Sequence, residues 1–169
     1  MLRHCLSLAL LLSLMPSAGL AEIEVSFRDG APKDRFTVTN TGNCPTGPMV
    51  VEIDMTNSVG KLIFDVTARG AGVQVFQPLE ITAGAEFLRI IPGVEDGQTG
   101  LQLDLVGLPA GGRISFTIDV DDTIGQREIT VSGSEMQGSA VIVQAGFSAE
   151  PGVFDDRAVA RVETPGCVS

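Results

Sequence analysis

Three aspartates at the end of one alternating stretch form the densest acidic group in the chain: Asp119, Asp121 and Asp122. On a β-strand, side chains two residues apart share a face at a spacing of roughly 7 Å. Asp119 and Asp121 could therefore lean together and bracket one hard cation. Calcium takes about six to eight oxygen ligands and suits carboxylates. The sequence thus predicts a calcium site at these three aspartates, with Glu135 or the neighbouring residues 95–96 as further ligands.

The same three aspartates have a second interpretation, in which they are solvated charges at the end of a strand. Charged side chains of this kind deter sheets from pairing edge to edge. The spacing also departs from the helix–loop–helix calcium loop. A loop starting at Asp119 would place Ile124 where glycine is needed and Thr130 where the bidentate acid belongs. Both interpretations stay open at the level of sequence.

The stretch that carries these acids predicts the fold class. Within residues 113–122, apolar Ile114, Phe116, Ile118 and Val120 alternate with polar residues, the pattern of a strand with one buried face. Similar short segments recur between Gly and Pro turns, which is typical of a sandwich or barrel. They are residues 22–27, 35–39, 49–55, 62–66, 73–76, 79–81, 87–91, 101–105, 128–132, 141–143 and 158–162. We predict an all-β, immunoglobulin-like β-sandwich of roughly 8–10 short antiparallel strands.

The first 21 residues predict a secretory signal peptide, cleaved after Ala21. A short basic start containing Arg3 precedes an apolar run, and small residues stand at Gly19 and Ala21. The apolar run is too short to span a bilayer of roughly 30 Å. We therefore expect an exported protein, periplasmic or extracellular, without a membrane span, in which residues 22–169 form a single β-sandwich domain.

Cysteine use agrees with export. Cleavage would remove Cys5 and leave only Cys44 and Cys167, an even pair in an oxidising compartment. The sequence predicts a disulfide between them, although two free thiols or intermolecular links would fit the same count.

The missing residue types argue against catalysis. His4 is the only histidine and lies in the predicted signal peptide, which leaves no base for a Ser-His-Asp or Cys-His unit and no histidine metal ligand. The chain also has no Trp or Tyr, the rings on which sugars and unpaired bases usually stack. What remains is carboxylate chemistry, including a second acidic pair at residues 155–156. We expect a protein that is not an enzyme, and a carboxylate-based hydrolase is the alternative.

The charge balance excludes two classes of partner. Cleavage would leave ten basic residues against 21 acidic ones. Nucleic-acid affinity depends on cations that meet phosphates, so we expect no nucleic-acid partner. An anionic membrane surface would repel the chain as well.

Three segments resemble a known family. They are residues 27–36 with Asn40 and Cys44; residues 62–66 followed by 72–78; and residues 116–123 leading to 129–135. Together they resemble small exported proteins of marine alphaproteobacteria labelled "aggregation factor core". That label implies a likeness to sponge aggregation factors, which are calcium-dependent adhesion proteins, and it transfers no catalytic residue.

These observations combine into one functional expectation. We expect a non-catalytic exported binding module for adhesion or for cell-surface or aggregation-type contact, with calcium as the only cofactor suggested. Its partner would be a protein or a surface glycan, and the sequence leaves the oligomeric state open. A structural accessory domain of an envelope complex is a further alternative.

Overall fold

The computed structural model describes residues 21–67, 76–124 and 131–164. Their strands form antiparallel sheets, which confirms the all-β prediction. The predicted signal peptide, apart from Ala21, and Cys167 lie outside the described residues. Within the described ranges, no helix reaches the length and apolar character of a membrane span.

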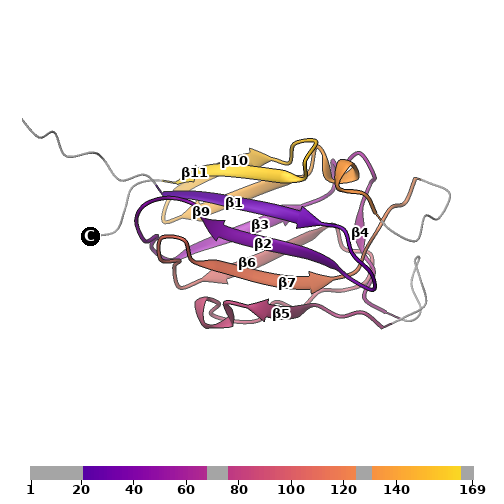
Figure 1. Ribbon diagram of the computed structural model, residues 1–169, viewed down its shortest axis with the longest axis horizontal. Coiled ribbons are helices and arrows are strands. Elements are labelled where there is room, and N and C mark those ends of the chain that lie inside the picture. The colour runs from indigo at the N-terminus through magenta and orange to yellow at the C-terminus, as the bar shows by residue number, and fades with distance from the viewer. Residues whose placement is uncertain (1–20, 68–75, 125–130, 165–169) are drawn as a thin grey trace, which may run out of the picture.

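Five strands make up the first sheet, which we call sheet A. They run in the order β11-β1-β2-β7-β5, from top to bottom at the front of Figure 1. Their bounds are β1 (Ala21–Arg28), β2 (Asp34–Asn40), β5 (Glu80–Ala83), β7 (Arg113–Ile118) and β11 (Val159–Thr164).

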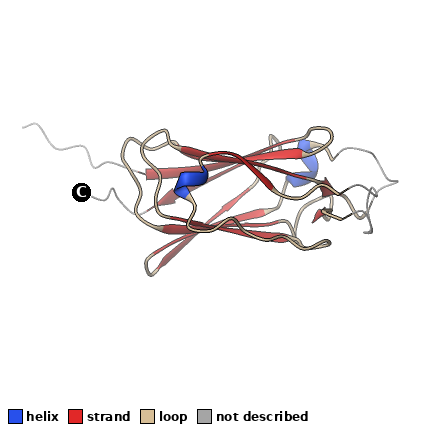
Figure 2. Ribbon diagram, turned by 90° about the horizontal axis from the view of Figure 1, so that it is seen from below, coloured by secondary structure: helices blue, strands red, loops and turns tan. Residues whose placement is uncertain are grey.

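Sheet B lies behind sheet A and has the strand order β10-β9-β3-β6. Its strands are β3 (Met49–Asp54), β6 (Gly100–Leu105), β9 (Ala140–Ala145) and β10 (Ser148–Val153). A third, two-stranded sheet pairs β4 (Ile63–Phe64) with β8 (Val120–Asp121) at one end of the molecule. Figure 2 shows the two main layers from below, with the short 3₁₀ helices η1 (Ala85–Phe87) and η2 (Gly133–Met136) in the connections between strands.

The core lies between the two layers and follows the alternation seen in the sequence. Ile114, Phe116, Ile118 and Val120 are all buried, as the pattern predicts. Phe36 sits at the centre of an aromatic group. Its ring stacks on Phe116 with 5.2 Å between centroids and meets Phe27 edge-on at 5.0 Å. Aromatic pairs in these arrangements add stability beyond the area that they bury.

The predicted continuous strand over residues 113–122 is wrong at Asp119. β7 ends at Ile118, and β8 begins at Val120 but pairs with β4 instead of a strand of sheet A. The cause is that β2, the partner of β7, begins at Asp34, opposite Ile118. Beyond that point the Asp34 carboxylate accepts the Val120 N–H at 3.0 Å and replaces the backbone partner.

Other strand predictions also need correction. Residues 87–91 contain only an isolated bridge from Leu88 to Leu105, and Ile90 and Ile91 are exposed. The segment 128–132 lies mostly outside the described residues, and η2 follows it. β10 is absent from the predicted strands; it contains Pro151, which an edge strand tolerates. The described residues therefore hold 11 strands, against the 8–10 predicted.

Candidate functional site

The predicted acidic residues lie at the end of the molecule where β4 pairs with β8. Asp119 occupies the break between β7 and β8, Asp121 lies in β8, and Asp122 follows it. β4 brings a fourth acid here, because Ile63 pairs with Asp121 and the Asp65 N–H donates to the Asp119 carbonyl at 3.1 Å. We call Asp34, Asp65, Asp96, Asp119 and Asp121 the acidic end.

Asp34 is a structural acid within this end. Only 2% of its surface is exposed. One carboxylate oxygen accepts the Gly30 N–H and the other accepts the Val120 N–H, each at 3.0 Å. Burial raises the pKa of Asp34 to about 7, although both backbone hydrogen bonds work against that rise. Asp34 therefore ties the β1–β2 turn to the start of β8.

Asp65 and Asp96 form a carboxyl pair. Asp65 is 1% exposed, and neither of its oxygens receives a hydrogen bond from an N–H or hydroxyl donor. Burial, together with the Asp96 carboxyl, raises the pKa of Asp65 to about 7, whereas the hydrogen bond from Asp65 lowers the pKa of Asp96. Asp96 also accepts the Val66 N–H at 3.1 Å. We infer that a proton held on Asp65 is shared with the Asp96 carboxylate.

The three predicted calcium ligands do not converge on a ready-made site. Burial and the charge of Asp121 raise the pKa of Asp119 to about 6. Asp122 instead accepts the Ile124 N–H of its own turn at 3.1 Å. Glu135 accepts the N–H and the hydroxyl of Ser132 at the start of η2. No group of three acidic, histidine or cysteine side chains in the described ranges is placed to hold a metal ion, so calcium binding stays a prediction.

The described residues include Cys44, one of the two cysteines of the predicted disulfide. Cys44 is half-buried in the loop between β2 and β3, beside Asn40, whose side-chain amide donates to the Cys44 carbonyl at 2.8 Å. Because Cys167 is outside the described residues, the pairing of Cys44 with Cys167 also stays a prediction.

Sequence reasoning missed a second site, on the outer face of sheet A. There an open pocket of about 620 Å³ is lined by four arginines: Arg28, Arg35, Arg113 and Arg157. We call it the arginine pocket. These four are a large share of the 11 basic residues in a chain that has 21 acidic ones. The outward alternation of Arg28, Arg35 and Arg113 is visible in the sequence, but nothing local shows that β7 is the neighbour of β2.

Strand register determines how the arginines are spaced. Arg28 on β1 stands directly opposite Arg35 on β2. Arg113 lies four residues from Thr117, which is the partner of Arg35 on β7, so it is roughly 13 Å further along the face at about 3.3 Å per residue. Gly84, with φ 74°, follows β5, and a Cβ there would collide with the Arg113 carbonyl oxygen. Glycine at position 84 thus allows the β5 end to lie against Arg113.

Hydroxyl groups line the same pocket. Ser26, Thr37, Thr82 and Ser115 contribute to its wall. The hydroxyls of Thr37 and Ser115 lie 3.1 Å apart, and Arg35 donates to the Thr82 hydroxyl at 3.0 Å. The pocket therefore combines guanidinium donors with groups that can both donate and accept hydrogen bonds.

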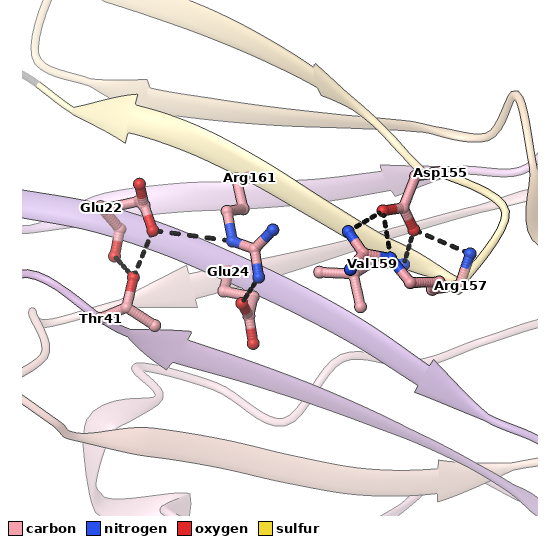
Figure 3. A network of polar contacts seen from close by, with 7 residues as sticks. All are labelled: Glu22, Glu24, Thr41, Asp155, Arg157, Val159 and Arg161. Carbon is pink, nitrogen blue, oxygen red and sulfur yellow. Dashed lines mark hydrogen bonds and ion pairs between the residues drawn. The ribbon is translucent and has the colours of Figure 1, made fainter.

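Four carboxylates around the arginine pocket already form ion pairs with other basic residues. Figure 3 shows Arg161 between Glu22 and Glu24 on one side, and Asp155 bound to Arg157 on the other. Lys33 pairs with Glu80 at 2.9 Å. Arg28, Arg35 and Arg113 form no ion pair within the described part of the chain.

A separate apolar pocket of about 470 Å³ lies beside the acidic end. Val66, Leu79, Val94 and the largely exposed Phe76 line it, with Asp96 at its edge. It offers shape and apolar surface but few groups that would orient a ligand.

Comparison of the chain with family models, with curated proteins and with solved structures finds no match in any of the three.

Proposed function

We propose that the protein is an exported, non-catalytic binding module that makes adhesion or cell-surface contacts through the outer face of sheet A. The observation that carries this proposal is the arginine pocket. In a chain with nearly twice as many acidic as basic residues, Arg28, Arg35 and Arg113 form no ion pair with a described carboxylate. Exposed cations left unneutralised in this way are available to a partner.

The architecture supports a role in binding. Backbone hydrogen bonds hold β1, β2 and β7 in one sheet, so their outward side chains keep fixed relative positions. We also propose that the fold is of the immunoglobulin-like kind. The antiparallel pairing and the chain's repeated crossing between sheets A and B, for example from β2 to β3 and from β10 to β11, support that proposal.

The structure gives a carboxylate hydrolase less support than it gives a binding module. Raised pKa values can mark catalytic acids. Here the two largest rises belong to Asp34 and Asp65, which are 2% and 1% exposed and so are out of reach of a substrate. Burial is the largest cause of both rises, and Asp34 has a structural role. Asp119 alone is partly exposed among the three acids with raised pKa values.

The proposal is tested with labelled protein, purified from the exported fraction and incubated with washed cells and with envelope fragments of the producing strain. We expect saturable retention that unlabelled protein competes away. Retention that never saturates, or none at all, would refute an adhesion role. Stoichiometric co-purification with one envelope protein would instead favour the accessory-domain alternative.

A further inference from the structure

We propose that the arginine pocket binds an acidic polysaccharide, whose sulfate or carboxylate groups are held by Arg28, Arg35 and Arg113. This inference rests on the proposed function, because it names the ligand class of the same face. It adds a chemical identity for the partner and the groups that recognise it.

The first step is the chemistry of the arginines. A guanidinium presents a planar fork of donors that matches the two oxygens of a carboxylate or sulfate group. Arg28 and Arg35 stand directly opposite each other, and like charges in that position destabilise a sheet. An anion that bridges them would remove this repulsion. The repulsion between Arg28 and Arg35 therefore destabilises the free protein, and a bound oxyanion would relieve it.

The second step is size. The pocket measures about 620 Å³, which lies within the range for ligand sites of about 300–1,000 Å³ and is far larger than one oxyanion. Arg113 lies roughly 13 Å along the face from the Arg28–Arg35 pair. Because the backbone positions of the three arginines are this far apart, a ligand with several anionic groups along an extended backbone, such as a charged polymer, fits them better than a single oxyanion.

The third step is the rest of the lining. Hydroxyls of Ser26 and Thr37, which are partly exposed, can hydrogen-bond to sugar hydroxyls. Phe27 is the only aromatic residue of the lining, and it is 6% exposed with its ring against Phe36 in the core. Nucleic-acid single strands need exposed rings for stacking, and so do most neutral sugars. A charged glycan, recognised through its anionic groups, needs none.

The negative charge of the whole chain does not prevent such binding at physiological salt. Exposed charges further apart than about 8 Å are largely screened there. The carboxylates of Asp155, Glu24 and Glu80 are already paired with Arg157, Arg161 and Lys33, respectively. The contacts between the arginines and the ligand are short and are screened less.

The experiment measures binding of the whole exported protein to dextran sulfate, polygalacturonate and neutral dextran of similar length, by titration calorimetry. The test variant is Arg28→Gln with Arg113→Gln. The matched control is Lys61→Gln with Arg89→Gln, which removes the same charge from exposed residues outside the lining of the arginine pocket. Circular dichroism and Tm confirm that both variants fold.

We expect one or both acidic polymers to bind and neutral dextran not to bind. The test variant should lose about tenfold or more in affinity, because each charged hydrogen bond contributes about 1.5–3 kcal/mol and about 1.4 kcal/mol is tenfold. The control variant should stay within about threefold of the parent protein. Equal losses in the two variants would overturn the assignment of the site.

Other outcomes identify other occupants, and each overturns the inference. Equal binding of a single-stranded DNA of the same charge would mean unselective attraction of polyanions. Binding of inorganic sulfate alone would mean a small-ion site. Self-association that the test variant abolishes, without polymer binding, would make a second copy the occupant.

This inference and the proposed function can fail separately. If no acidic polymer binds but cells still retain the protein, this inference fails and the proposed function stands. If cells do not retain the protein either, the proposed function fails as well.

Discussion

Replacing Asp65 by asparagine tests the carboxyl pair at the acidic end. In the parent protein Asp65 is buried, receives no N–H or hydroxyl donor, and lies beside Asp96. An asparagine has nearly the same shape. Its amide can donate to the Asp96 carboxylate at every pH, whereas Asp65 can donate only while it holds a proton. We therefore expect Asp65→Asn to stabilise the protein at high pH and to change little at low pH.

The size of the effect follows from the pKa of Asp65, which rises from 3.8 to about 7. A rise of about three units corresponds to a ceiling of about 4 kcal/mol at 1.36 kcal/mol per unit. Part of the rise reflects the hydrogen bond to Asp96. That part adds nothing to the loss of stability at high pH, because the same bond lowers the pKa of Asp96. We expect a gain of about 2 kcal/mol at pH 8.5, or roughly 4–8 °C in Tm for a chain of this size.

The sign follows from proton linkage. A carboxyl whose pKa is higher in the folded state keeps its proton there, while the unfolded chain has already lost it. Between about pH 4 and pH 7 the folded state therefore binds more protons, and the unfolding free energy falls as pH rises. The parent protein should lose stability through this window. Asp65→Asn should lose less.

The assay is urea unfolding at pH 5 and at pH 8.5, with the exposed Asp156→Asn as the control. The control should leave the stability unchanged within about 0.5 kcal/mol at both values. If Asp65→Asn destabilises the protein equally at both pH values, the inference that Asp65 shares a proton with Asp96 is wrong. Asp65 would then be an ionised carboxylate with a partner such as a bound cation.

Three further predictions concern the acidic end and the cysteines. Asp34→Ala should destabilise the protein by about 1–3 kcal/mol for each backbone N–H left buried without an acceptor, and more at pH 5 than at pH 8.5, because alanine carries no buried charge; equal urea midpoints for variant and parent would contradict the role of Asp34. The calcium hypothesis predicts a higher Tm in millimolar calcium than in EDTA, and loss of that difference in Asp119→Asn with Asp121→Asn; identical Tm values would remove the metal. If Cys44 and Cys167 form a disulfide, the reducing agent dithiothreitol should lower the Tm of the parent but not that of the double variant Cys44→Ser with Cys167→Ser. The expected loss in the free energy of unfolding is roughly 4–5 kcal/mol for so long a loop, and titration of two free thiols in the exported protein would contradict the bond.

Local sequence determined which side chains face the core. Successive side chains of a strand point to opposite faces whatever strand lies beside them. For that reason the alternation alone was enough to predict the buried Phe36 and Phe116.

Only the tertiary structure decided which strands are neighbours, and with that both candidate sites. The order β1-β2-β7 brings Arg113 to the face that carries Arg28 and Arg35, and the pairing of β4 with β8 buries Asp65 near Asp119. The sequence placed Asp119 in an unbroken strand, but the side chain of Asp34, 86 positions from Val120, accepts the Val120 N–H that would have continued the strand. An alternating pattern carries no information about its partner, because side-chain direction is a property of one strand and pairing is a property of two.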